Sequence, residues 1–95
     1  MTYLITYDLH NRRNYLPLYQ LMASWGAVRL TESLWMADLR GPAEAIRDLV
    51  AGKLDNDDTV AVVQLQHGTD WATLRVKPAA NAWLGNNVTP SKKAA

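Results

Sequence analysis

Tyr3-Leu4-Ile5-Thr6-Tyr7-Asp8-Leu9, near the start of the chain, is the segment from which the fold is best deduced. It is rich in β-branched and aromatic residues, which predicts a strand over about residues 2–9. Successive side chains of a strand point to opposite faces of the sheet. The two faces are Tyr3, Ile5 and Tyr7 on one side and Leu4, Thr6 and Asp8 on the other. Both faces therefore carry apolar side chains, and one also carries a carboxylate.

A helical period follows this strand. Apolar side chains recur at spacings of three and four, which predicts a helix from Asn14 to Trp25. The residues of this stripe are Tyr15, Leu18, Tyr19, Leu21, Met22 and Trp25. Asn14 can cap the start, and Gly26 stands where a left-handed cap is expected. A second helix is predicted after Gly41-Pro42, with a buried stripe of Ile46, Leu49, Val50 and Leu54.

Three further strands are predicted, over residues 27–31, 34–39 and 59–66. The first two are adjacent, with a tight connection or bulge near residues 31–33. The acidic run at residues 55–58 resembles the opening of a calcium loop, but the glycine and the later glutamate of such a loop are missing. We therefore expect this run to form the turn between the second helix and the last strand.

The element order is strand, helix, strand, strand, helix, strand, which is the order of the α+β ferredoxin-like fold. This fold is a four-stranded antiparallel sheet with both helices on one face. The other face also carries apolar side chains, and such a face needs a second layer. We expect that layer to come from a second copy in a homodimer or from a tail that folds back.

A C-terminal extension begins at about residue 67. Residues 71–76 fit either a fifth, edge strand or an extended segment, and residues 78–84 fit one or two helical turns. Trp71 and Trp83 are large apolar side chains, so we expect them to pack on the sheet or on a partner. We expect a single domain over residues 1–84 and a mobile tail over residues 85–95.

Length and composition narrow the class of protein. Ninety-five residues are enough for one small domain with one core. The chain has no cysteine, which excludes disulfides and thiolate metal sites. No apolar run approaches the roughly 20 residues of a membrane helix, and no signal-peptide pattern is present, so we expect a cytoplasmic protein without a membrane partner. The net charge of +1 does not by itself indicate nucleic-acid binding.

Asp8 is the first candidate site residue, because it stands at a strand tip beside the basic turn at residues 10–13. It could hold a divalent metal near a phosphate, or it could be a strand-end acid bonded to a backbone N–H or to Arg12. Mg²⁺ prefers oxygen ligands and keeps several waters. One carboxylate per chain is therefore enough only if two subunits combine theirs.

Four basic residues are candidates for contacts to a substrate. Arg12, Arg13 and Arg29 could bind phosphates, because guanidinium matches phosphate geometry. Arg29 is the strongest of the three, since we expect its strand to lie beside the first one and to be rigid. His10 could act as a general acid or base. The alternative for all four is a solvated surface side chain.

Three segments resemble a known family: Tyr7-Asp8, the helix ending at Trp25-Gly26, and the stretch Arg29-Leu30-Thr31-Glu32-Ser33-Leu34-Trp35. They resemble the small CRISPR-associated adaptation ribonuclease-like proteins, which are ferredoxin-like dimers that partner the CRISPR integrase. The chain looks closer still to the SinR-like proteins and to distant kin of the VapD ribonucleases. The resemblance implies that Asp8 of each subunit faces its mate and binds Mg²⁺ or Mn²⁺ for phosphodiester hydrolysis.

The sequence therefore predicts a dimeric, metal-dependent endonuclease acting on RNA or DNA. Asp8 would be the catalytic metal ligand, and Arg12, Arg13 and Arg29 would contact phosphates. Two alternatives stay open. One is a non-catalytic module on the same fold that binds nucleic acid or another protein. The other is a toxin-like ribonuclease held by an antitoxin.

Overall fold

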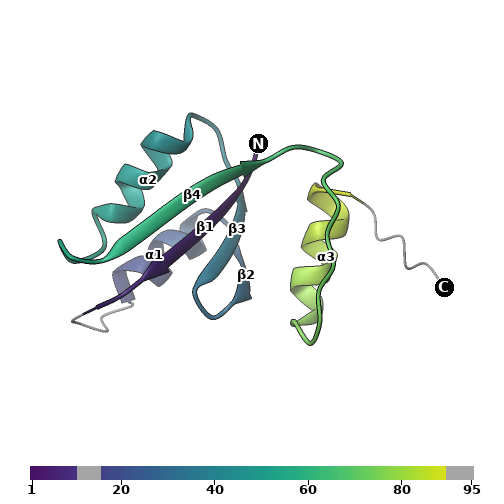
Figure 1. Ribbon diagram of the computed structural model, residues 1–95, viewed down its shortest axis with the longest axis horizontal. Helices are drawn as coiled ribbons and strands as arrows, with labels where there is room; N and C mark the ends of the chain where they lie inside the picture. Colours follow the sequence, from purple (N-terminus) through teal and green to yellow (C-terminus); the bar gives the residue numbers. More distant parts are fainter. Residues whose placement is uncertain (11–15, 90–95) are drawn as a thin grey trace.

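The computed structural model describes residues 1–10 and 16–89. Its strands are β1 (Thr2–Asp8), β2 (Val28–Thr31), β3 (Leu34–Asp38) and β4 (Thr59–Leu65), and its helices are α1 (Leu16–Ser24), α2 (Ala43–Ala51) and α3 (Pro78–Asn87). The strands form one antiparallel sheet in the order β2-β3-β1-β4 (Figure 1). This order confirms the predicted α+β, ferredoxin-like fold.

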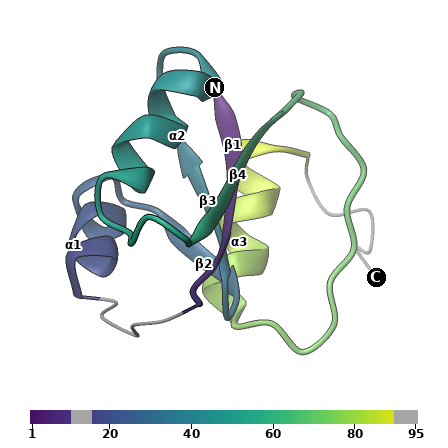
Figure 2. The same ribbon diagram turned by 60° about the vertical axis from the view of Figure 1, so that its left-hand side comes forward.

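Two helices cover one face of the sheet, which we call the first face. Strand β1 supplies Tyr3, Ile5 and Tyr7 to it, as the alternation predicted. These side chains are buried together with Leu18 and Met22 of α1 and Ile46 and Val50 of α2. Figure 2 shows α1 and α2 on the same side of the sheet. The main hydrophobic core therefore lies between this face and these helices.

Helix α1 ends in a cap formed at Gly26. Gly26 has a φ of 65°, in the left-handed region that glycine adopts without a steric penalty. The Ala27 amide donates to the Met22 carbonyl at 3.0 Å, and the Gly26 amide donates to the Ala23 carbonyl at 3.0 Å. This pair of bonds is the Schellman motif, which satisfies carbonyls at a helix end. The cap predicted at Gly26 is confirmed.

The opposite face, the second face, is only partly covered. Helix α3 folds back over it and buries Met36 of β3 against Ala80, Leu84 and Val88. Of the two expected covers, the structure contains the folded-back tail (Figure 2). Toward β4 the second face is open: Asp8, Ala61 and Val63 are exposed there, Val63 by 52%. We call these three residues the open part of the second face.

The extension differs from the sequence prediction in its boundary. Residues 71–76 form no strand, and α3 continues to Asn87 instead of ending near residue 84. Val88 is buried, and its carbonyl accepts the Gly68 amide at 2.9 Å. The indole of Trp71 donates to the Thr89 carbonyl at 2.8 Å. Residues 85–89 are thus packed, and the predicted tail boundary is wrong for them; residues 90–95 lie outside the described residues.

No helix among the described residues has the length and apolar character needed to cross a bilayer.

Candidate functional site

Asp8 closes β1 on the second face. Its Cα pairs with that of Thr59 on β4, and its side chain is exposed. The neighbouring Tyr7 amide donates to the Ser33 carbonyl at 3.3 Å, so the pairing toward β3 ends beside Asp8. Within residues 1–10 and 16–89, the Asp8 carboxylate makes no hydrogen bond or ion pair. The described structure therefore assigns this carboxylate no structural partner.

His10 is held next to Asp8. The His10 backbone N–H donates to Asp58 Oδ1 at 2.8 Å, and its ring Nε2 lies 3.4 Å from Thr59 Oγ1. Directly opposed residues of an antiparallel pair have Cβ atoms about 4.5–5.5 Å apart. Asp8 opposes Thr59, and His10 contacts Thr59. The structure thus brings the predicted metal ligand and the predicted acid or base to the same residue of β4.

The turn before β4 adds further carboxylates at this end of the sheet. Oxygens of Asp55, Asp57 and Asp58 all lie within 4.8 Å of one another. Asp58 has a structural role, because its Oδ2 accepts the Asp55 amide at 2.8 Å while its Oδ1 accepts the His10 amide. The predicted helix-to-strand turn is present, and it anchors the residue that follows Asp8 and Leu9.

Arg29 lies away from Asp8. It pairs with Trp35 on the first face, and its strand β2 is separated from β1 by β3. The expectation that the strand of Arg29 lies beside the first strand is therefore wrong: a ferredoxin-like crossover places β3 between them. Arg29 Nε donates to the Glu32 carbonyl at 2.9 Å, and Nη2 donates to Tyr19 Oη at 3.0 Å and to the Glu32 carbonyl.

Two aromatic rings also hold Arg29. Its guanidinium carbon lies 5.1 Å from the centre of the Tyr19 ring and 5.3 Å from that of Trp35. At these distances the ring electrons attract the cation. These contacts therefore hold the Arg29 guanidinium in place, but two strands away from Asp8 and on the opposite face of the sheet. The other two arginines, Arg12 and Arg13, lie outside the described residues.

The half-buried Trp35 and the buried Tyr7 connect this network to β1. Trp35 Nε1 donates to Tyr7 Oη at 3.1 Å. Burial raises the pKa of the Tyr7 hydroxyl above 10.0, while the bond from Trp35 and the charge of Arg29 act in the opposite direction. The phenol stays neutral near pH 7, so this pair orders the first face and takes no part in acid–base chemistry there.

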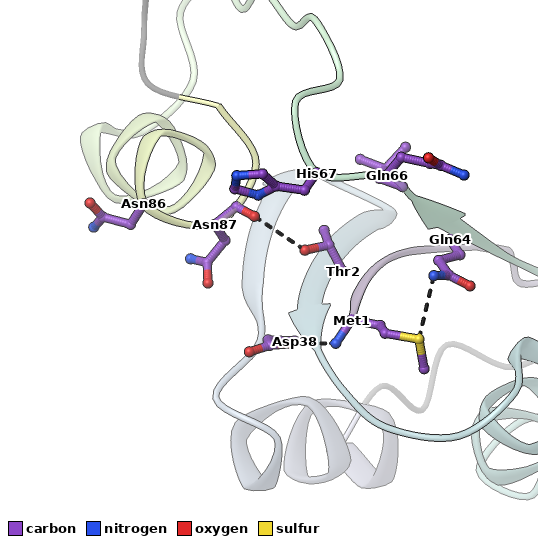
Figure 3. Close-up of a pocket in the computed structure, with 9 residues that line it drawn as sticks. Met1, Thr2, Asp38, Gln64, Gln66, His67, Asn86 and Asn87 are labelled. Carbon is purple, nitrogen blue, oxygen red and sulfur yellow. Dashed lines mark hydrogen bonds and ion pairs between the residues drawn. The ribbon is translucent and has the colours of Figure 1, made fainter.

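The described surface includes a polar groove and a cationic groove. The polar groove, of about 580 Å³, lies at the opposite end of β1 from Asp8 (Figure 3). It is lined by amide and other polar side chains, among them Asp38, Gln64, Gln66, His67, Asn86 and Asn87. Asp8, His10 and Arg29, the predicted site residues that the structure describes, do not line it, so it is separate from the site at Asp8.

The other groove, the cationic groove, has a volume of about 540 Å³ and lies between the edge strand β2 and residues 74–77. Arg29 lines it together with Arg75 and Lys77, two residues that sequence reasoning did not single out. The signal available in the sequence was weak, because the two cations are isolated in a segment without periodicity. Only the folding back of α3 brings them to β2.

A comparison of the chain with models of known protein families finds no match.

Proposed function

We propose that this chain is a homodimeric, metal-dependent phosphodiesterase that acts on RNA or DNA, as its resemblance to the CRISPR-associated ribonuclease-like proteins implies. One observation carries the proposal. The Asp8 carboxylate is exposed on the open part of the second face and, among the described residues, has no partner, while His10 is held beside it. A carboxylate that stabilises the fold would be expected to have a partner there.

The residues fit a hard divalent cation. Mg²⁺ and Mn²⁺ take oxygen ligands and keep several waters, so two carboxylates can be enough. Asp8 lies on the same face as Ala61 and Val63, which are apolar and exposed. A second copy docked face to face on these residues would place both Asp8 side chains in the layer between the two sheets. Each chain would then supply one ligand.

His10 and Asp8 have different roles in this proposal. The bound ion would supply positive charge against the phosphate oxygens. Asp8 would orient that ion, and His10 Nε2, which lies near the Thr59 hydroxyl, would take or give a proton at the reacting oxygen. The acidic turn at residues 55–58 makes this end of the sheet unfavourable for a phosphate in the absence of a cation. Cleavage should therefore depend on the metal.

The test is cleavage of end-labelled single-stranded RNA and DNA with Mg²⁺, with Mn²⁺ and with EDTA. We expect Asp8→Asn to reduce the rate by about 100-fold or more, since even residues behind a metal ligand cost about 10- to 100-fold. Asp38→Asn is the matched control, because Asp38 also ends a strand on the second face and is exposed. Equal rates in wild type and Asp8→Asn would show that a contaminating nuclease is the source.

A second test addresses His10. Proton transfer by a positioned side chain contributes typically about 10²- to 10⁴-fold. We expect His10→Asn to reduce the rate by about 100-fold. A variant that cleaves at the wild-type rate would remove His10 from the mechanism and leave Asp8 as the only assigned residue.

A non-catalytic nucleic-acid-binding module is the second candidate, and one observation favours it. The cations that converge on the described surface lie in the cationic groove and not beside Asp8. This alternative predicts binding that weakens as salt rises, without cleavage under any metal condition.

A further inference from the structure

The cationic groove has more positive than negative charge. Arg29, Arg75 and Lys77 line it, and among the described residues that line it Glu32 is the only acid. Within the described residues, neither Arg75 nor Lys77 forms an ion pair. Three cations that converge on one groove without matching acids repel one another and attract an anion. Charge therefore indicates an anionic ligand.

Arg29 gives the groove a fixed donor. Its Nε and Nη2 both donate to the Glu32 carbonyl, and Nη2 also donates to Tyr19 Oη. The two rings and the Glu32 carbonyl hold the guanidinium in place before any ligand arrives. A pre-ordered guanidinium loses little conformational freedom when it binds a phosphate.

The other wall of the groove is shaped by an unusual backbone. Arg75 has a φ of 61°, the only positive value of a non-glycine residue in the described part of the chain. Residues other than glycine occupy this region at a cost, and such positions cluster at binding sites. The next cation, Lys77, precedes Pro78 at the start of the ten-residue helix α3, where the helix dipole also favours an anion.

The groove also has an apolar part. Tyr19, Leu74 and Val76 line it, and Leu74 is 74% exposed. A volume of about 540 Å³ is larger than one phosphate needs. Cations beside apolar and aromatic side chains are the combination that single-stranded nucleic acids use, with the backbone on the charges and the bases on the apolar surface.

We infer that the cationic groove binds the phosphodiester backbone of a single-stranded nucleic acid. The inference rests on the proposed function for its substrate class and deepens it, because it names a binding surface distinct from Asp8. Thr31, the last residue of β2, and Glu32, in the β2–β3 connection, line the groove, and the Ser33 carbonyl of the same connection accepts a hydrogen bond from the Tyr7 amide next to Asp8. In Figure 1, the chain enters α3 on the side of this connection. A strand held in the groove can therefore extend past the connection toward Asp8.

The experiment is fluorescence anisotropy of the full chain with a labelled oligoribonucleotide and, in parallel, the matching oligodeoxyribonucleotide, both in EDTA so that no cleavage occurs. The variant is Arg75→Gly with Lys77→Gln, in which glycine keeps the left-handed backbone at residue 75. We expect binding to weaken by about tenfold or more. The slope of log K against log salt should become shallower by about 1.4, which is two contacts at about 0.7 each.

Arg40→Gln with Lys53→Gln is the matched control, since both are exposed cations outside the groove and the change in net charge is the same. Equal weakening in the two double variants would overturn the inference, and so would inorganic phosphate that binds as tightly as the oligonucleotides. If the wild type binds through the groove but never cleaves, the proposed activity is rejected and the binding groove is retained. If the groove variant cleaves and binds as the wild type does, the groove inference is rejected and the proposed activity is retained.

Discussion

The two faces of the sheet are built from the same strands but differ in how completely they are covered. On the first face, Tyr3 and Ile5 are fully buried under α1 and α2. On the second face, Met36 is fully buried under α3, but Val63 is 52% exposed on the strand at the far edge. The comparison indicates that the core under the first face is closed, while the second face leaves an apolar area uncovered.

Two exposed aspartates on the second face differ in whether they have a hydrogen-bond partner. Asp38 and Asp8 both end strands on the second face, at opposite ends of the sheet. Asp38 Oδ1 accepts a hydrogen bond from the N-terminal ammonium at 2.8 Å, whereas Asp8 has no partner among the described residues. Exposure alone therefore does not mark a site. The combination of exposure, missing partner and open apolar surroundings is what distinguishes Asp8.

The largest predicted effect is a loss of folding stability that differs between two neighbouring residues of β1. Ile5→Ala should lower the free energy of unfolding by about 3–4 kcal/mol, because it leaves a cavity in the sealed core. Leu4→Ala removes a half-buried side chain from the second face and should cost only about 1–2 kcal/mol. Urea denaturation of both variants measures the difference. Equal losses would show that the second face is packed as tightly as the first.

The next effect tests whether α3 is an integral layer. Leu84 is 3% exposed and packs against the second face, so Leu84→Ala should cost about 2–3 kcal/mol. Leu49→Ala on α2 is the control, since Leu49 is 57% exposed and its truncation should change stability by less than about 0.5 kcal/mol. If both variants unfold at the wild-type urea concentration, α3 contributes nothing to the core.

Local patterns predicted the sheet and the helices on its first face. The alternation in β1, the helical stripe of α1 and the cap at Gly26 all act over a few residues, so they can be recognised without the rest of the fold. The path of residues 67–89 could not be predicted in this way. It depends on Met36 and Val28, far away in the sequence, and on bonds such as that from Trp71 to Thr89.

The candidate site, like the fold, could be predicted only in part from the sequence. Asp8 and His10 are two residues apart, and the predicted strand end places both at one tip of the sheet. Arg29 was assigned to phosphate binding, but its expected place beside β1 was wrong because β3 intervenes. Its neighbours Arg75 and Lys77 reach the same groove only through the folded-back extension. Tertiary packing over more than 40 residues of chain carries no local signal.

A smaller effect concerns the hydroxyl of Tyr7 on the first face. Tyr7→Phe leaves the Trp35 N–H without its acceptor and should cost about 1 kcal/mol. Burial raises the pKa of Tyr7 in the folded state above its unfolded value of 10.0. The Tyr7 hydroxyl therefore contributes fully to stability below pH 10, and this contribution is lost as the pH rises through the higher pKa of the folded state. The difference in stability between wild type and Tyr7→Phe should shrink above pH 10 in urea titrations at several pH values.

The smallest effect on folding should be the most informative about the partner of the second face. Val63 is already exposed, so Val63→Lys should change the free energy of unfolding of one chain by less than about 0.5 kcal/mol. A lysine there would have to be desolvated in a face-to-face dimer, which is unfavourable. We therefore expect sedimentation equilibrium to show a dimer for the wild type and a monomer for Val63→Lys, with Leu49→Lys on α2 remaining dimeric.

The cleavage rates of the same variants show whether Asp8 acts together with Asp8 of a second chain or within a single chain. If the metal needs a carboxylate from each chain, the monomeric Val63→Lys variant should lose activity together with Asp8→Asn, although its own Asp8 and His10 are unchanged. Raising the protein concentration should restore part of that activity, because it repopulates the dimer. A monomer that cleaves at the wild-type rate would mean that Asp8 acts within a single chain. The open part of the second face would then serve another partner.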